Sequence, residues 1–191
     1  MNEPDLLVAL APVLDALEAL GVRHFVGGSI ASSAHGIARA SIDADVVAEL
    51  RTEHCATSVK RLADSYYVSE ERVRDAVARR VSFNVIHLAA MLKVGFFVSK
   101  DRPFDRRATM RAEARPCTAV GGRELPQSTA EDVVLAKLEW CRRGGEVSER
   151  QWTDILGVLQ ASGDTMDQAY VSSGAEELGV ADLLERVRAE L

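Results

Sequence analysis

The sequence has little cysteine and no long hydrophobic run. Three cysteines occur among 191 residues, far apart and without a CxxC pair or a Cys/His metal-ligand spacing, so neither a disulfide framework nor a zinc site is expected. No apolar run reaches the roughly 18 residues of a membrane span. The acidic N-terminal segment lacks the basic region of a signal peptide. We therefore expect a cytoplasmic protein with reduced thiols and no membrane association.

Positively charged residues are outnumbered by negatively charged ones. The chain has 23 Lys and Arg against 29 Asp and Glu, which gives a net charge of −6. A protein with this charge is not expected to bind nucleic acid nonspecifically through its overall charge. The exception is the basic segment, residues 100–115 (KDRPFDRRATMRAEAR). It is either a docking surface for a polyanion such as RNA or an ordinary solvated surface segment.

Two common nucleotide-binding motifs are missing. The chain contains neither GxxxxGK[S/T] nor GxGxxG, so a P-loop and a Rossmann dinucleotide site have no support. Hydrophobic residues make up 47% and charged residues 27% of the chain, an ordinary globular balance. The length suits one domain, or one domain with a helical extension.

Apolar spacing and turn residues predict an α/β (α+β) fold, with a core over residues 1–125 and a C-terminal helical bundle over residues 126–191 packed on it. We expect, in chain order, a helix ending at Gly21, a strand at 22–26, a short helix from Ser29 to about Gly36, a strand at 44–50, a helix at 53–65, a strand at 66–68, a helix at 70–80, a β-hairpin of 83–88 and 93–98, two helices with capping boxes at Ser128 and Ser148, and a last helix at 181–190.

The most informative stretch is FVGGSIASSAHGIARASIDADVV, residues 25–47. Asp43 and Asp45 lie two residues apart at a predicted strand, so their side chains point to the same face. Two adjacent carboxylates repel each other unless a cation neutralises them. Hard oxygen ligands of this kind suit Mg²⁺, which proteins hold with one or two carboxylates plus substrate phosphates. Asp43 and Asp45 are therefore candidate metal ligands and catalytic residues.

A glycine turn precedes the two aspartates. Gly27 and Gly28 lie between a strand and the helix that begins at Ser29, where the missing Cβ atoms let a ligand approach the backbone. The helix N-terminus offers unpaired N–H groups to an anion, and Arg39 adds a positive charge. Taken singly, the glycine turn can be purely structural and the aspartates a solvated pair. Together they indicate a phosphoryl- or nucleotidyl-transfer site.

This stretch resembles the nucleotidyltransferase-fold superfamily, whose signature is Gly-Gly/Ser, about nine to thirteen residues, then acid-hydrophobic-acid. Gly28-Ser29, thirteen intervening residues and Asp43-Ala44-Asp45 fit it. With FNVIHLAAMLKVGFFV and STAEDVVLAKLEWCRRGGEVSERQWTDILGVL, residues 22–160 look like bacterial proteins related to AbiEii-type toxins. The resemblance implies a mixed sheet flanked by helices, Mg²⁺-dependent transfer of a nucleoside monophosphate from an NTP, an acceptor such as tRNA or protein, and an antitoxin partner.

The sequence departs from that family at one position. The family has a third acidic residue in a segment resembling KVDFFV, where this chain has Gly95. A third carboxylate would help hold the metal and accept the proton of the attacking hydroxyl. Gly95 therefore leaves three alternatives open: a weakened enzyme, a nucleotide binder without turnover, or a site completed by another residue.

Other residues carry less weight. Lys137 is by resemblance a contact of the triphosphate, or else a surface lysine paired with a neighbouring acid. His35, at the end of the short helix, could border the cleft. Remaining candidates are Arg150 and Asp154, expected on the polar face of a helix, and Trp140 and Trp152, expected in the core.

Overall fold

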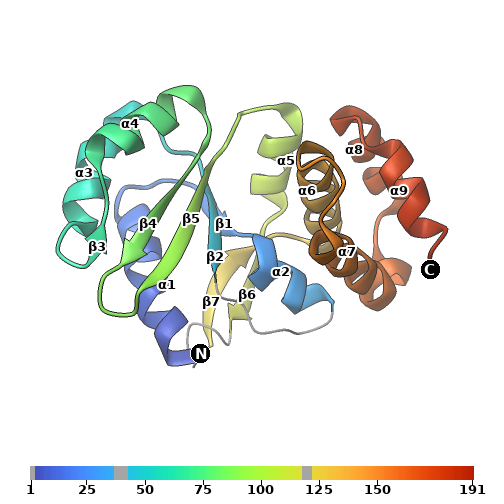
Figure 1. The fold of residues 1–191 in the computed structure, drawn as a ribbon, viewed down its shortest axis with the longest axis horizontal. Coiled ribbons are helices and arrows are strands. Elements are labelled where there is room, and N and C mark those ends of the chain that lie inside the picture. Colours follow the sequence, from blue (N-terminus) through green and yellow to red (C-terminus); the bar gives the residue numbers. More distant parts are fainter. Residues whose placement is uncertain (1–2, 37–42, 118–121) are drawn as a thin grey trace.

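The computed structural model describes residues 3–36, 43–117 and 122–191. The described strands form one mixed sheet of seven strands in the order β3-β4-β5-β2-β1-β7-β6 (Figure 1). Their bounds are β1 (His24–Val26), β2 (Ala44–Ala48), β3 (Tyr66–Tyr67), β4 (Ser82–His87), β5 (Leu92–Val98), β6 (Glu113–Cys117) and β7 (Arg123–Gln127).

Strand β2, which follows Asp43, lies at the centre of this sheet. It pairs antiparallel with β1 and parallel with β5, in a register that places Asp45 opposite Gly95. Beyond β5 the sheet continues with β4. Strands β4 and β5 form an antiparallel hairpin, in which Asn84 lies opposite Gly95. A row of Asp45, Gly95 and Asn84 therefore runs across three neighbouring strands.

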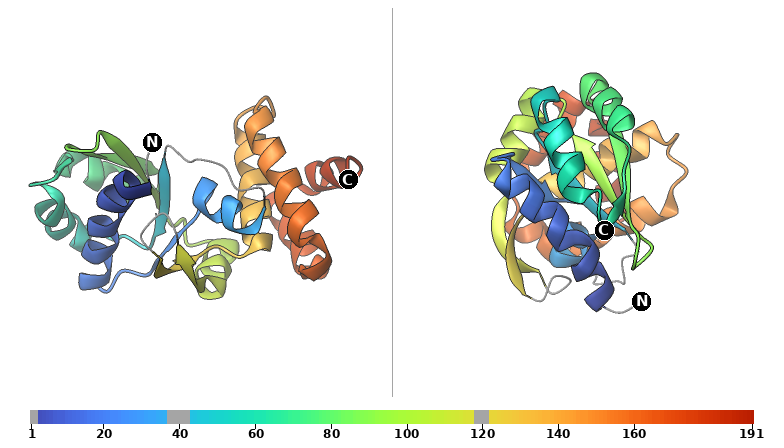
Figure 2. Two further views of the ribbon diagram at one scale, coloured as in Figure 1. Left: turned by 90° about the horizontal axis from the view of Figure 1, so that it is seen from below. Right: turned by 90° about the vertical axis from the view of Figure 1, so that its left-hand side faces the viewer.

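The helices divide between the two ends of the elongated molecule (Figure 2). Those at one end are α1 (Glu3–Ala19), α3 (Thr52–Leu62) and α4 (Glu70–Arg79). Those toward the other are α5 (Pro103–Arg111), α6 (Ala130–Arg143), α7 (Glu149–Ser162), the 3₁₀ turn η2 (Gly163–Thr165), α8 (Gln168–Leu178) and α9 (Ala181–Arg188). Helix α2 (Gly28–His35) lies between, packed against β2, α6 and α7.

Alternation along the central strands divides their side chains between the two faces of the sheet. Ala44, Val46 and Ala48 of β2 and their counterparts on β5 are buried in a cluster with α1, α3 and α4. Residues at the intervening positions, Asp45 and Gly95 among them, face the opposite side. A second apolar cluster fills the helical end and includes Val133, Leu135, Ile155 and Leu183. The face of β2 and β5 that carries Asp45 and Gly95 therefore lies beside the junction between the two ends.

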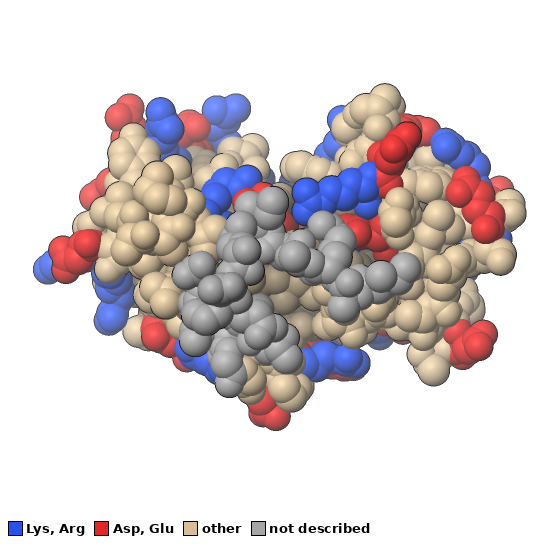
Figure 3. Space-filling model, turned by 60° about the horizontal axis from the view of Figure 1, so that its bottom comes forward, with Lys and Arg blue, Asp and Glu red and all other residues tan. Residues whose placement is uncertain are grey.

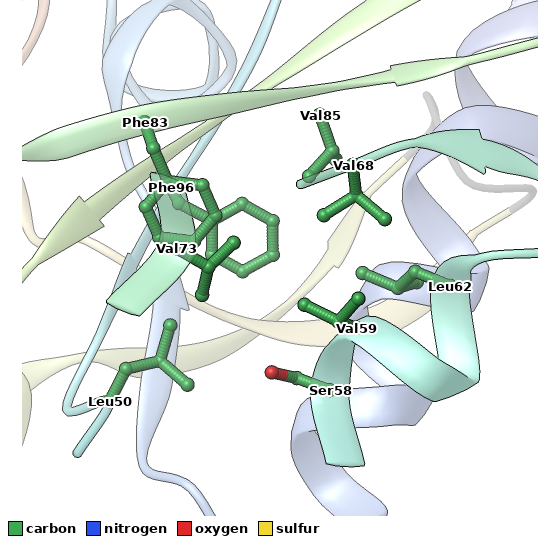
Figure 4. A pocket seen from close by; sticks show the side chains of 9 residues that line it. All are labelled: Leu50, Ser58, Val59, Leu62, Val68, Val73, Phe83, Val85 and Phe96. Carbon is green, nitrogen blue, oxygen red and sulfur yellow. The ribbon is translucent and has the colours of Figure 1, made fainter. Parts of the chain in front are cut away.

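A small apolar cavity lies under α3 and α4. Figure 4 shows its lining, which consists of Leu50, Ser58, Val59, Leu62, Val68, Val73, Phe83, Val85 and Phe96. Ser58 provides the hydroxyl, which donates to the carbonyl oxygens of His54 and Cys55 at 2.9 and 3.0 Å. The cavity offers no unsatisfied polar group to a ligand and is part of the core.

The structure confirms the predicted α/β fold and most predicted elements. The first helix, β1 to β5 and their intervening helices, and the later helices α6, α7 and α9 form close to the expected bounds. One prediction is wrong in detail: Thr129, and not Ser128, caps α6, accepting a hydrogen bond from the N–H of Asp132. Ser148 caps α7 as expected.

Several elements were missed by the sequence patterns, namely α5, β6, β7 and α8. Strand β6 contains Pro116 and lies at the edge of the sheet, where a missing N–H is tolerated. Strand β7 contains Pro126 and runs through the predicted boundary at residue 125, so the helical part begins after Gln127. Within the described ranges, no helix is both long and apolar enough to cross a bilayer.

Candidate active site

The glycine turn forms as the sequence predicts. Gly27 is the N-cap of α2, and its N–H donates to the carbonyl oxygen of Asp45 at 2.9 Å. Gly28 has φ +57°, a left-handed conformation that favours glycine. The Ser29 hydroxyl donates to the carbonyl oxygen of Asp43 at 3.3 Å. These contacts fasten the first turn of α2 to the chain that carries both aspartates.

The Asp45 carboxylate lies between two glycines. A Cβ atom placed on Gly28 would lie 2.0 Å from Oδ2 of Asp45, and one placed on Gly95 would lie 2.7 Å from Oδ1. Both distances are far below van der Waals contact. The carboxylate thus occupies the space that side chains at positions 28 and 95 would need. Gly95 is more than the absence of a third acid, because it makes room for the carboxylate of Asp45.

Asp43 precedes β2 and forms an ion pair with a lysine of the neighbouring strand β5. Lys93 of β5 lies with Nζ 3.2 Å from Oδ2 of Asp43, and their side chains are 46% and 37% exposed. Burial raises the pKa of the Asp45 carboxyl, and the negative charge of Asp43 raises it further. The two carboxylates are therefore electrostatic neighbours, as the Asp-x-Asp spacing predicts.

Three cations from three elements act on the Asp45 carboxylate. Lys93 of β5, Lys137 of α6 and Arg150 of α7 each lower the pKa of Asp45 against the effect of burial. Figure 3 shows a notch between the two ends of the molecule, with Lys and Arg side chains on both rims and acidic atoms between them. Such a surface is suited to a polyphosphate, whose negative charge would face the exposed cations Lys93 and Arg150.

Lys137 is buried. Its Nζ donates to Oδ2 of Asp154 at 2.8 Å and to Oε1 of Gln151 at 2.9 Å, and both ionic side chains are 7% exposed. The prediction of a lysine paired with an acid is therefore confirmed, but its placement on the surface is wrong. This ion pair joins α6 to α7 and fixes where the Lys137 charge lies.

The open part of the site extends across β5 and β4. Asn84 is exposed, and its Oδ1 would lie 3.5 Å from a Cβ atom at Gly95. Phe97, two residues further along β5, meets the ring of Trp140 edge-on at a centroid distance of 5.8 Å. Trp140 is 48% exposed, so its predicted place in the core is wrong. Trp152 is partly buried beside the helical cluster.

The predicted site residues fall into three groups. Gly27, Gly28, Ser29, Asp43 and Asp45 come together around the first turn of α2, and Lys137 acts electrostatically on Asp45. Arg39 lies outside the described residues. His35 is buried at the far end of α2, and its Nε2 lies 2.7 Å from the carbonyl oxygen of Ser128, a contact that fixes the helix instead of bordering the cleft.

The residues that sequence analysis missed are Lys93 and Asn84, together with the position of Arg150. Lys93 could have been found by extending the alternation of β5 two residues back from Gly95. Asn84 needed the register of the hairpin, and Arg150 needed the packing of α7 on α6.

The carboxylate pair fits a single hard cation. Asp43 and Asp45 supply oxygen donors. Burial raises the pKa of Asp45 most, and repulsion by Asp43 raises it further; a divalent cation would offset both effects. Among the residues that the structure describes, no three His, Cys, Asp or Glu side chains gather as a metal site. Two carboxylates with phosphate and water as further ligands are a common arrangement for Mg²⁺.

The basic segment is engaged within the protein. Its arginines pair with acids as follows: Arg102 with Asp105 and Glu139, Arg106 with Asp101, Arg107 with Glu177, Arg111 with Glu131 and Asp132, and Arg115 with Glu113. Several of these pairs fasten α5 to α6 and α8. They give the segment a structural role, and its contact with nucleic acid stays a prediction.

Neither a protein-family model nor a curated protein matches this chain. The solution structure of the antibiotic-resistance factor ANT(2'')-Ia is similar over 98% of this chain and 96% of that chain, with a TM-score of 0.55 and 13% identity. The crystal structure of an antigenic nucleotidyltransferase-like protein from Paracoccidioides brasiliensis is similar over 99% and 94%, with a TM-score of 0.56 and 12% identity. The chain therefore has the nucleotidyltransferase fold.

Proposed function

We propose that the protein is a Mg²⁺-dependent nucleotidyltransferase that moves a nucleoside monophosphate from an NTP to an acceptor hydroxyl. The observation that carries the proposal is the Asp45 carboxylate, packed against the first turn of α2 beside Asp43 and acted on by three cations. Such a transfer requires a backbone turn that binds phosphate, a carboxylate pair that holds the metal ion, and positive charge near the triphosphate. The fold similarity supports the same activity.

Each residue has a role that its chemistry suits. The N–H groups of Gly28 and Ser29 would bind phosphate oxygens, and Arg150 and Lys137 would supply positive charge to the triphosphate. Asp43 and Asp45 would hold Mg²⁺. When bound, Mg²⁺ would neutralise charge on the phosphates and polarise the α-phosphate.

The transfer itself is a displacement at the α-phosphorus. The acceptor oxygen bonds to the α-phosphorus, the bond from that phosphorus to the bridging oxygen breaks, and pyrophosphate leaves. The hydroxyl proton passes to water, because the glycine at position 95 cannot accept it. We therefore expect turnover to be slow compared with an enzyme that has a positioned base, which typically contributes about 10²–10⁴-fold.

The resemblance to AbiEii-type proteins extends the proposal to a toxin-like role in the cytoplasm. The acceptor is then the 3′ end of tRNA, a protein hydroxyl or a small molecule, and an antitoxin would silence the site. These features rest on the sequence resemblance.

Label transfer tests the activity directly. The protein is incubated with Mg²⁺, each α-³²P-labelled NTP, and either total cellular RNA or total cellular protein. Wild-type protein should label one of these pools, and Asp43→Asn, which keeps the size but removes the charge, should reduce labelling by at least about 10²-fold. Equal labelling by both proteins would contradict the assigned role of Asp43.

A second candidate function is nucleotide binding without turnover. Two observations favour it: glycine stands where the third acid is expected, and Lys93 already neutralises Asp43. NTP binding in the presence of Mg²⁺, without transfer to any acceptor, would select this candidate. Failure to bind any NTP would contradict both candidates.

A further inference from the structure

We propose that Lys93 is an internal counter-ion of the carboxylate pair. A bound metal ion displaces the Lys93 ammonium group onto the triphosphate of the nucleotide. Metal and nucleotide therefore bind cooperatively. The inference rests on the proposed function for the identity of the ligands. It assigns a role to a side chain that neither the aspartate motif nor the glycine turn includes.

The contact geometry is the first support. Lys93 Nζ lies 3.2 Å from Oδ2 of Asp43. Asp45, two residues further on, also feels the ammonium: among the cations that lower its pKa, Lys93 has the largest effect, ahead of Lys137 and Arg150. The ammonium therefore serves both carboxylates, in the region where a divalent cation would bind them.

The strand register explains how Lys93 reaches this position. Lys93 and Gly95 share a face of β5, and Gly95 is paired with Asp45 on β2. Because Gly95 has no side chain, the carboxylate of Asp45 leans over it, to within 2.7 Å of where a Cβ atom would lie. One strand thus supplies both the space for Asp45 and the charge that balances Asp43.

The contrast with Lys137 shows why Lys93 is the cation that can move. Lys137 is held by Asp154 and Gln151, and the Lys137 and Asp154 side chains are 7% exposed. Lys93 is 46% exposed at its side chain. An exposed ion pair on a flexible lysine is weak and is easily exchanged for another partner. Lys93 can therefore leave Asp43 without disturbing the packing of the core.

Displacement couples the two ligands. An ammonium and a divalent cation repel each other and compete for the same carboxylate oxygens, so metal alone must break the Lys93–Asp43 pair. A triphosphate beside the metal offers the displaced ammonium new oxygen partners. Nucleotide then strengthens metal binding, and metal strengthens nucleotide binding by the same factor.

Binding measurements on the full chain test this directly. Mn²⁺ is titrated by electron paramagnetic resonance into wild-type protein and Lys93→Met, first without nucleotide and then with a non-hydrolysable ATP analogue. Lys93→Met should bind Mn²⁺ alone about fivefold or more tightly, and the strengthening of Mn²⁺ binding by the analogue should fall at least about fivefold. Lys93→Arg keeps the charge and should stay near wild type. Lys60→Met on α3 controls for the change in net charge.

The outcomes separate this inference from the proposed function. If Lys93→Met binds Mn²⁺ no more tightly than wild type and the coupling is unchanged, the counter-ion role is wrong, while label transfer can still establish the enzyme. If the affinities shift as expected but no acceptor is labelled, the counter-ion role stands and catalysis is wrong. If neither protein binds Mn²⁺ at all, both are wrong.

Discussion

Restoring a carboxylate at position 95 is the most informative perturbation of this site. Any side chain there must move Oδ1 of Asp45, which would lie 2.7 Å from the new Cβ atom, by a few tenths of an ångström or more. Gly95→Asn and Gly95→Asp share this steric cost, about 1–3 kcal/mol for overpacking. They differ in charge, so the comparison isolates the effect of the carboxylate.

The charge effect has a sign that depends on metal. At an effective dielectric constant of 20, two like charges 4 Å apart repel by about 4 kcal/mol, so Gly95→Asp should be less stable than Gly95→Asn without Mg²⁺. With Mg²⁺ the added carboxylate becomes a ligand, and the difference should shrink or reverse. Since 1 kcal/mol shifts Tm by roughly 2–4 °C in a chain of this size, thermal melts with and without Mg²⁺ resolve the effect.

Activity supplies the second readout. The carboxylate introduced by Gly95→Asp would face the acceptor and could take its proton, so single-turnover transfer should be at least about tenfold faster in this variant than in Gly95→Asn. NTP affinity in the presence of Mg²⁺ should differ much less between the two variants. Identical melting curves in both conditions together with identical transfer rates would refute the placement of position 95 beside the cation site.

Two further predictions concern stability. Lys137→Met removes the cation that faces the buried carboxylate of Asp154 and should lower the free energy of unfolding, measured by urea denaturation, by about 3–5 kcal/mol. Combining Lys137→Met with Asp154→Leu should recover most of this loss. If the losses of the two single variants simply add in the double variant, the two side chains are not coupled. Burial lowers the pKa of His35 below its ordinary 6.5, so the unfolded chain binds the proton more tightly and stability is lost as pH falls below about 6.5. Wild-type protein should therefore lose more stability between pH 7.5 and 5.5 than His35→Gln, and equal losses would show that His35 titrates normally in the folded protein.

Local sequence signals determined much of the fold. Apolar periodicity and capping residues located α1, α3, α4, α6 and α7, and alternation located β2, β4 and β5. These signals act between residues that are close in the chain. Elements with weak local signals were missed: β6 and β7 contain proline, and α5 buries little more than Phe104 and Ala108. Such elements form because partners distant in sequence cover them.

The sequence also determined the chemistry of the site. The glycine turn and the Asp-x-Asp pair are short motifs whose spacing fixes which side chains share a face. They placed Gly28, Ser29, Asp43 and Asp45 together without knowledge of the sheet order. Position 95 was identified by resemblance, but only as a missing acid.

The tertiary structure decided which charges and which free space surround the two carboxylates. The parallel pairing of β5 with β2 brings Gly95 under the carboxylate of Asp45 and Lys93 beside Asp43. The packing of α7 on α6 buries Lys137 and brings Arg150 toward the aspartates. The charge, burial and free space around the Asp45 carboxylate depend on residues from four different elements. A local sequence pattern cannot encode them, because these residues are distant in the chain. For that reason the sequence specified the candidate carboxylates, and only the fold specified which cations lie near them.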